Sequence, residues 1–459
     1  MNPRRRESSF PFVSAIILWD QSEHMVRENQ NKGVLTMANH ILDATTVSKP
    51  FGSGQKVVRV ALRYDTKVDG TALNADAYAV ENRTILNVFA ANSPDAAAPE
   101  AGGEYVILDL DKKDPEAATV RSLHPRPSGG PRPGGGPPTH VHPSGRVRTG
   151  PSGLAKKREP LAVKVEQIAG IKAADGTVID RGSIVSDKEI NELSDKFRQF
   201  WHGDVEYNLY IPENCDPGKN YPLVLFIGDA SIAGKEARIT LEQGLGALCW
   251  VTDEMQREQP CYVLAPVHFD PEPITDDDYW CTERLDVIKD ICDEVIEKHN
   301  IDPRRVYTTG QSMGCMSSFE LMYRYPDYFA GALCVSGHWD REKIAACARR
   351  GQHLWFVLSE ADGHGYPCAE DVKRILSEEG VKFGWYEWDG RLSPEELSAL
   401  ADKAASDGNP FRITVYPGES ALRLGMEDEC GNGHPAGWHL SYRVKGLCRW
   451  LLSNRLEEG

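Results

Sequence analysis

The chain has 459 residues, of which 41% are hydrophobic, and it carries 52 Lys and Arg against 68 Asp and Glu, a formal charge of −16. This length allows two or three globular domains with sizeable cores. The acidic balance argues against a general affinity for nucleic acid or for an anionic membrane, so we expect a small molecule or a neutral polymer as the partner.

Residues 1–36 show no pattern of a folded domain, and we expect a disordered extension, with Met37 as a candidate true start. A basic N-terminal segment followed by the apolar run FPFVSAIILW resembles a signal peptide. The run is short, however, and no small-residue cleavage site follows it. No other segment approaches the roughly 20 apolar residues that a membrane span needs.

The number and spacing of the cysteines indicate the cellular compartment of the protein. All eleven lie between Cys215 and Cys448, with no CxxC pair and no regular spacing. This pattern favours reduced thiols in a core over a disulfide framework or a zinc site, and we predict no metal site. Together with the poor signal it favours a cytoplasmic location, with secretion as the alternative.

Residues 37–190 are predicted to form an all-β domain. Short alternating or apolar runs such as KVVRVALRY, TILNVFAAN and EYVILDLD are separated by polar turns, which is typical of a β-sandwich. Residues 124–153 are so rich in Pro and Gly that we expect a flexible loop there. Because the strand-like run LAVKVEQIAGI follows, this loop is an insertion within the sandwich.

Residues 191–459 are predicted to form an α/β domain. Several runs, such as YPLVLFIGD and HLWFVLSE, are apolar enough for strands of a parallel sheet that is covered on both faces. Helical patterns lie between the strands, and the clearest places Leu285, Ile288, Cys292 and Val295 on one face. The predicted fold class is therefore α/β with a mostly parallel sheet, preceded by an all-β sandwich.

The motif Gly310-Gln311-Ser312-Met313-Gly314 is a G-x-S-x-G sequence. It follows an apolar strand predicted over 306–309 and precedes a helix predicted over 313–324, which is the setting of a nucleophile elbow. The two glycines let strand and helix approach each other around a strained turn. We therefore interpret Ser312 as a nucleophile rather than as part of an ordinary turn.

A serine nucleophile needs a histidine base and a carboxylate that orients the base, and in this fold both follow the serine along the chain. Asp362 comes directly after the strand HLWFVLSE, at the edge where parallel sheets assemble their sites, and is the predicted acid. Glu360 and Asp340 are the alternatives, and Asp340 is better explained as a loop cap.

Three histidines follow the predicted acid. His364 is too near Asp362 in sequence to reach the serine from a separate loop. His434 lies in the glycine-bracketed loop GNGHPAGW after the last predicted strand and is the predicted base. His439, in a predicted terminal helix, is the alternative base and otherwise packs or lines the pocket.

The tetrahedral intermediate of such a reaction also needs hydrogen-bond donors. One is predicted to be the backbone N–H of Met313, directly after the nucleophile. The other is predicted to be the amide of Asp229 or Ala230, in the turn after the strand YPLVLFIG.

Several stretches resemble a known family. YPLVLFIGDAS, CYVLAPV, the run from IDPRRVYTTGQSMG to AGALCVSG, and HPAGWHLSYRVKGLCRWLLS are similar to esterases of the feruloyl-esterase and polyhydroxybutyrate-depolymerase type, the "predicted peptidase" family. The similarity covers about residues 204–455. The N-terminal sandwich resembles the immunoglobulin-like domain that precedes the catalytic domain in one branch of these esterases.

The resemblance implies an α/β-hydrolase fold, hydrolysis of carboxylic esters without a cofactor, and a triad of Ser312, Asp362 and His434. The chain departs from the family in two places. It has Gly228 where members commonly have a histidine, and it has three residues instead of two between His434 and Trp438. The second departure keeps His439 open as the base.

The pocket is less well defined by the sequence. A helix with the capping box Ser393-Pro394-Glu395-Glu396 is predicted within 389–410, as a pocket wall or as an exposed surface helix. Aromatic residues near the expected site are core residues as often as ligand platforms. The candidate pocket residues are Gln311, Trp280, Trp339, Trp438 and His439.

The leading hypothesis is a serine carboxylesterase that acts on short acyl or aryl esters, such as feruloyl or acetyl groups on a polysaccharide. A serine peptidase of the same fold is the second hypothesis, because the same triad cleaves amides. The third is a non-catalytic carbohydrate-binding or interaction protein. The sandwich could also mediate homo-oligomerisation.

Overall fold

The computed structural model describes residues 39–122, 138–141, 147–149, 156–158, 162–213, 215–232, 236–267 and 274–457. The extension predicted over residues 1–36 lies outside these ranges, as does most of the Pro/Gly-rich insertion 124–153. The described residues belong to one unit of the chain, which begins at residue 38.

The first part of this unit is a β-sandwich. Its larger sheet has the strand order β14-β1-β2-β5-β4, and its smaller sheet has the order β13-β10-β3. The strands are β1 (Ile41–Phe51), β2 (Gly54–Asp69), β3 (Tyr78–Val80), β4 (Ile85–Ala91), β5 (Gly102–Leu110), β10 (Lys164–Gln167), β13 (Gly182–Val185) and β14 (Lys188–Asn191). We call residues 39–191 the sandwich domain.

Along the strands of the sandwich domain, every second side chain points inward, and these side chains form the core. Val60 and Leu62 on β2 and Val106 and Leu108 on β5 are fully buried and share one hydrophobic cluster. Residues 120–179 also contain three two-stranded pairs: β6 (Val120–Ser122) with β9 (Lys156–Arg158), β7 (Pro138–Val141) with β8 (Val147–Thr149), and β11 (Ile171–Lys172) with β12 (Val178–Ile179). The pair β7–β8 lies within the insertion, where the sequence predicted only a loop.

The second part is an α/β domain built on one nine-stranded sheet. The strand order is β15-β16-β18-β17-β19-β20-β21-β23-β22, with β15 and β16 antiparallel and the strands from β18 to β22 parallel. The strands are β15 (Arg198–His202), β16 (Val205–Tyr210), β17 (Tyr221–Ile227), β18 (Tyr262–Pro266), β19 (Ile301–Gln311), β20 (Gly331–Val335), β21 (Leu354–Ser359), β22 (Gly384–Glu387) and β23 (Phe411–Tyr416).

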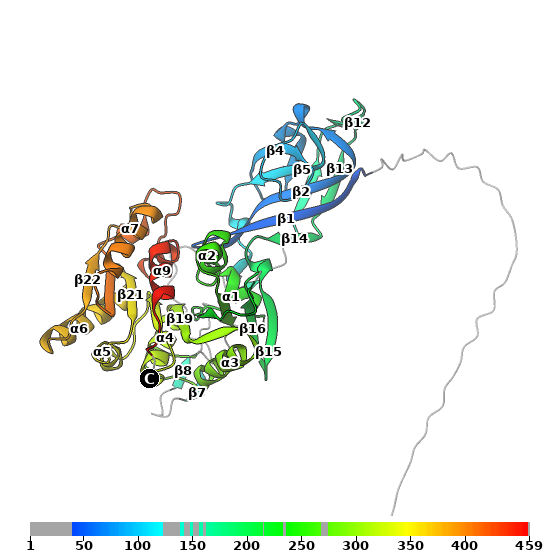
Figure 1. The fold of residues 1–459 in the computed structure, drawn as a ribbon. Helices are drawn as coiled ribbons and strands as arrows, with labels where there is room; N and C mark the ends of the chain where they lie inside the picture. Colours follow the sequence, from blue (N-terminus) through cyan, green and yellow to red (C-terminus); the bar gives the residue numbers. More distant parts are fainter. Residues whose placement is uncertain are drawn as a thin grey trace, which may run out of the picture. The chain divides into compact units, whose positions relative to one another are not determined.

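Helices flank this sheet on both faces (Figure 1). Strand β17 shows why: Leu223, Leu225 and Ile227 belong to one hydrophobic cluster, and Val224 and Phe226 belong to the other. The first cluster includes residues of α3 (Arg284–Lys298), α4 (Met313–Arg324), α5 (Arg341–Arg349) and α6 (Gly365–Glu378). The second includes residues of α1 (Arg238–Glu242), α2 (Asp253–Glu258), α7 (Pro394–Ala405), α8 (Gly433–Ser441) and α9 (Lys445–Ser453).

The predicted helix periodicity is confirmed in α3, whose buried residues include Leu285, Ile288, Cys292 and Val295. The predicted capping box at Ser393 is also confirmed, because Ser393 and Glu396 exchange both hydrogen bonds at the start of α7. Helix α7 packs against α9: a Cβ placed on Gly446 of α9 would lie 2.4 Å from the carbonyl oxygen of Ser398.

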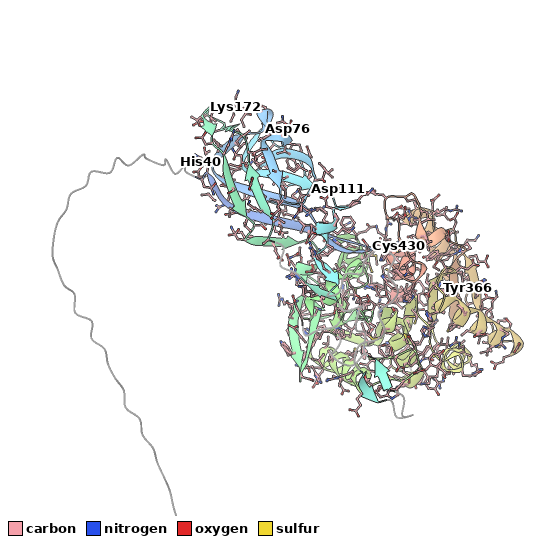
Figure 2. All side chains as sticks on the ribbon, turned by 180° about the vertical axis from the view of Figure 1, so that it is seen from behind. His40, Asp76, Asp111, Lys172, Tyr366 and Cys430 are labelled. Carbon is pink, nitrogen blue, oxygen red and sulfur yellow. The ribbon has the colours of Figure 1, made fainter. Side chains whose placement is uncertain are left out.

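Side chains of both domains are drawn in Figure 2, where His40, Asp76, Asp111 and Lys172 mark the sandwich domain and Tyr366 and Cys430 mark the α/β domain. All eleven cysteines are free thiols, and nine of them are buried. No helix among the described residues combines the length and the apolar character needed to span a bilayer.

Candidate active site

Ser312 occupies a strained turn between β19 and α4. Its φ is 55° and its ψ is −117°, a backbone conformation that side-chain-bearing residues rarely adopt. The chain around it is crowded, because a Cβ placed on Gly310 would lie 2.4 Å from Gly314 and one placed on Gly314 would lie 1.8 Å from the carbonyl oxygen of Ile227. The Ser312 amide donates to the carbonyl oxygens of Val335 and Ser336, which fixes the turn against the end of β20.

Three side chains that the sequence placed far apart meet at this turn. The Oγ of Ser312 and the Nε2 of His434 are 2.9 Å apart, and the Nδ1 of His434 and the Oδ2 of Asp362 are 2.7 Å apart. Asp362 follows the carboxyl end of β21, and His434 lies in the first turn of α8. This is the hydrogen-bonded order of nucleophile, base and orienting acid.

Asp362 is fully buried, so its charge must be stabilised by hydrogen bonds. Its Oδ1 accepts from the backbone amides of His364 and Gly365, at 3.2 Å and 3.1 Å. Burial raises the pKa of Asp362, but the hydrogen bond and charge of His434 and these two amides outweigh it, so the pKa lies below its usual value. The carboxylate form is the one that can orient the Nδ1–H of His434.

His434 is held by a helix rather than by the loop that the sequence predicted. Asn432 caps α8 by accepting a hydrogen bond from the His434 amide at 2.9 Å. One turn later, Trp438 packs edge to face against the His434 ring, with 5.0 Å between ring centroids. The glycines on both sides of His434 suggested a loop, but Asn432 starts a helix there.

The three amides proposed as oxyanion donors differ in their surroundings. Among the described residues, no acceptor is found for the amides of Met313 and Ala230. The Asp229 amide is instead 3.3 Å from Oε1 of Gln243 and donates to it. Met313 and Ala230 are therefore the candidates that this conformation leaves open to a ligand.

The predicted pocket residues fall into two groups. Trp438 is half-buried beside His434, and Trp280 is half-buried, with its amide 3.0 Å from Oδ1 of Asp276. Trp339 and Gln311 are fully buried. The Trp339 indole N–H donates to Glu320 in the core, so this ring does not offer a surface to a ligand.

His439 faces a different hollow. Together with Phe51 and Gly52 of the sandwich domain it lines a cavity of about 450 Å³, whose lining includes none of Ser312, Asp362 and His434. The distances above place His434, not His439, at the serine. Of the alternative acids, Asp340 caps α5 through the Lys343 amide, as the sequence suggested, and Glu360 accepts from the Gly418 amide.

Sequence reasoning missed two residues at this site. Ser336 is buried and has a φ of 47°, and its carbonyl oxygen holds the Ser312 amide. Gln243 touches both the turn after β17 and Gln311. Ser336 lies at the end of the run AGALCVSG, but nothing in that run indicates a contact with the serine turn. Gln243 lies in no motif, and a glutamine that follows a short helix carries no signal of a contact 14 residues back along the chain.

Comparisons with known proteins bear on both domains. A family model described as the esterase Ig-like N-terminal domain matches residues 43–180, which confirms the immunoglobulin-like resemblance of the sandwich domain. A 50-residue stretch is 44% identical to poly(3-hydroxyalkanoate) depolymerase C of Paucimonas lemoignei. That stretch covers 11% of this chain and only 12% of the depolymerase.

The chain is also similar to a solved structure described as the crystal structure of a thermostable esterase. The TM-score is 0.69 at 23% identity, and the alignment covers 90% of this chain and 100% of that one. At this identity the likeness concerns the fold, and it extends through both domains. The chain therefore has an esterase-type Ig-like domain followed by a domain of the α/β-hydrolase fold.

Proposed function

We propose that this protein is a serine carboxylesterase that hydrolyses short acyl or aryl esters. The observation that carries the proposal is the hydrogen-bonded chain from Ser312 through His434 to Asp362, set on a strained turn between strand and helix. A structural serine gains nothing from a histidine and a buried carboxylate in this order. A nucleophile requires both.

In the proposed reaction, His434 takes the proton of Ser312 as the serine oxygen attacks the ester carbonyl. The negative charge on the carbonyl oxygen is met by the amides of Met313 and Ala230. His434, now protonated, donates to the departing alcohol, and an acyl-enzyme remains on Ser312. A water molecule then loses a proton to His434 and attacks the acyl carbonyl carbon. As the bond between this carbon and the Ser312 oxygen breaks, His434 returns the proton to that oxygen, and the acid is released.

The substrate class rests on chemistry and on the relatives. An ester needs only the triad and the oxyanion donors, whereas a peptidase would also need groups that bind a peptide. The half-buried ring of Trp438 beside His434 offers an apolar surface to an aryl or alkyl leaving group. The thermostable esterase and the depolymerase are both named for action on esters, the latter on a polyester.

The test compares p-nitrophenyl acetate, methyl ferulate and an aminoacyl p-nitroanilide as substrates for the wild type and Ser312→Ala. We expect ester turnover by the wild type, little amide turnover, and a loss of at least about 10³-fold in kcat for the variant. A fluorophosphonate should label the wild type and not the variant. A wild type that neither turns over an ester nor takes the label would overturn the proposal, and a preference for the anilide would indicate a peptidase.

A further inference from the structure

We propose that Gln243 is a positioning residue for the oxyanion loop, defined here as residues 228–230, and that the tip of the β1–β2 hairpin holds Gln243 in place. The inference rests on the proposed function, because it concerns the same site. It assigns a role to a glutamine outside the triad and to a turn of the sandwich domain.

Gln243 follows the last residue of α1 and is only 5% exposed. Its Oε1 accepts from the Asp229 amide at 3.3 Å and from Nε2 of Gln311 at 3.4 Å, and its Nε2 donates to the carbonyl oxygen of Thr240 at 3.0 Å. Both ends of the amide group are thus used. Such a side chain has a fixed position, and losing it would leave buried polar groups without partners.

These bonds tie the oxyanion loop to the nucleophile turn. Gln311, the neighbour of Ser312, also donates to Oδ2 of Asp229 at 3.2 Å, and Oδ1 of Asp229 accepts from the Ser231 amide at 2.8 Å. The loop lies directly on the glutamine, because a Cβ on Gly228 would be 2.2 Å from its Nε2. Turning the Asp229 peptide would break this network, so Gln243 sets the direction in which the adjacent Ala230 amide points.

The sandwich domain supports this arrangement from the outside. A Cβ on Gly52 would lie 2.6 Å from the carbonyl oxygen of His439, on the helix that carries His434. Gly54, with a φ of 114°, faces the carbonyl oxygens of Glu242 and Gln243, at 3.3 Å and 3.6 Å from its would-be Cβ. The hairpin tip therefore packs backbone to backbone against α8 and against the segment that presents Gln243.

The first experiment replaces the polar group and keeps the shape, with Gln243→Met. We expect kcat on p-nitrophenyl acetate to fall about 10- to 100-fold, less than the loss caused by deleting an oxyanion donor outright, while KM changes by less than about threefold. Phenylboronic acid, which forms a tetrahedral adduct on the serine, should bind more weakly by a similar factor. The matched control is Gln256→Met on α2, whose side chain bonds the carbonyl oxygens of Trp250 and Cys261 and should leave kcat unchanged.

The second experiment tests the hairpin with Gly54→Ala, alone and combined with Gln243→Met, because a methyl group on Gly54 would meet the carbonyl oxygens of Glu242 and Gln243. Because both changes act through one loop, we expect the double variant to lose little more than Gln243→Met alone. If Gln243→Met does not fold, Gln243→Asn replaces it, since the shorter amide cannot reach the Asp229 amide.

Four results would count against the inference. A folded Gln243→Met that keeps kcat and boronate affinity within twofold overturns it, as does a double variant in which the two losses multiply. A fall in thermal stability with an unchanged kcat assigns Gln243 a structural role only. An inactive wild type would overturn the proposed function and this inference with it. If the wild type is active, the results for the Gln243 variants test this inference alone.

Discussion

Asp362, the proposed acid of the triad, illustrates how single residues determine the chemistry of the candidate site. Asp362 is buried, yet three hydrogen bonds to its two oxygens keep it ionised. Only an ionised Asp362 holds His434 as the tautomer with a proton on Nδ1 and a free acceptor at Nε2. In the proposed reaction, the proton of Ser312 moves to that free Nε2.

Replacing Asp362 with Asn should therefore spare the fold and stop the reaction. An amide in place of the carboxylate donates to Nδ1 and forces the ring proton to Nε2, which then cannot accept from Ser312. We expect kcat to fall about 10³- to 10⁴-fold with KM nearly unchanged, measured on p-nitrophenyl acetate. A loss below tenfold would contradict the assignment of Asp362, and Glu360→Gln serves as the control for the neighbouring carboxylate.

The depressed pKa of Asp362 adds a pH dependence to the same comparison. A carboxyl group whose pKa is lower in the folded than in the unfolded state contributes stability that is fully present above its unfolded pKa, about 3.9, and is lost as the pH falls through the folded value. Urea unfolding should therefore show the wild type losing stability relative to Asp362→Asn only below about pH 4. A gap between the two that stays constant down to pH 2 would contradict this.

At the scale of elements, the nucleophile turn depends on how closely β17, β19 and α4 approach one another. Gly314, in the first turn of α4, has no room for a methyl group beside the carbonyl oxygen of Ile227. Gly314→Ala should push α4 away from β17 and lower the free energy of unfolding by about 1–3 kcal/mol. Because the shift moves Ser312, kcat should also fall, even under conditions in which the variant is fully folded. Chemical denaturation and ester assays measure the two effects.

A matched control for this change is Gly218→Ala, in an exposed turn where the nearest atom to the new methyl group would be 3.4 Å away. Its stability and activity should stay within experimental error of the wild type. If Gly314→Ala is as benign as Gly218→Ala, the elbow does not need its second glycine.

The helices show which elements could be predicted from the sequence and which could not. Local signals sufficed for α3, α4 and the capping box of α7, because periodicity and caps act within a few residues. The helix around His434 was missed because the flanking glycines have poor helix propensity, and the Asn432 cap and packing against Trp438 outweigh it. Trp339 was taken for a pocket residue because nothing local reveals its bond to Glu320.

At the scale of the whole molecule, one buried carboxylate links the two domains. Glu242, at the end of α1, is fully buried, and its Oε1 accepts from Nε of Arg158 on β9 and from Nε of Arg238, each at 2.9 Å. Arg158 also donates to Glu189 at 2.6 Å. Burial lowers the pKa of Arg158, but the charges and hydrogen bonds of Glu242 and Glu189 raise this pKa by more than burial lowers it. The guanidinium therefore stays charged.

Arg158→Met should therefore weaken both the docking of the sandwich domain and the site next to it. Removing one partner of a buried ion pair costs about 3–5 kcal/mol, and we expect the lower end because Arg238 still contacts Glu242. Arg349→Met, which breaks exposed pairs with Glu342 and Glu379, should cost less than about 1 kcal/mol. Calorimetry of the two variants and the wild type measures these two losses of stability.

The activity of Arg158→Met then separates two ways in which the sandwich domain can matter. Glu242 directly precedes Gln243, so a shift of this segment should reach the oxyanion loop and lower kcat about as Gly54→Ala does, without a matching rise in KM. If Arg158→Met loses stability but keeps full kcat at a temperature where it is folded, the sandwich domain only stabilises the α/β domain. A parallel loss of kcat and boronate affinity would instead make the sandwich domain part of what aligns the catalytic site.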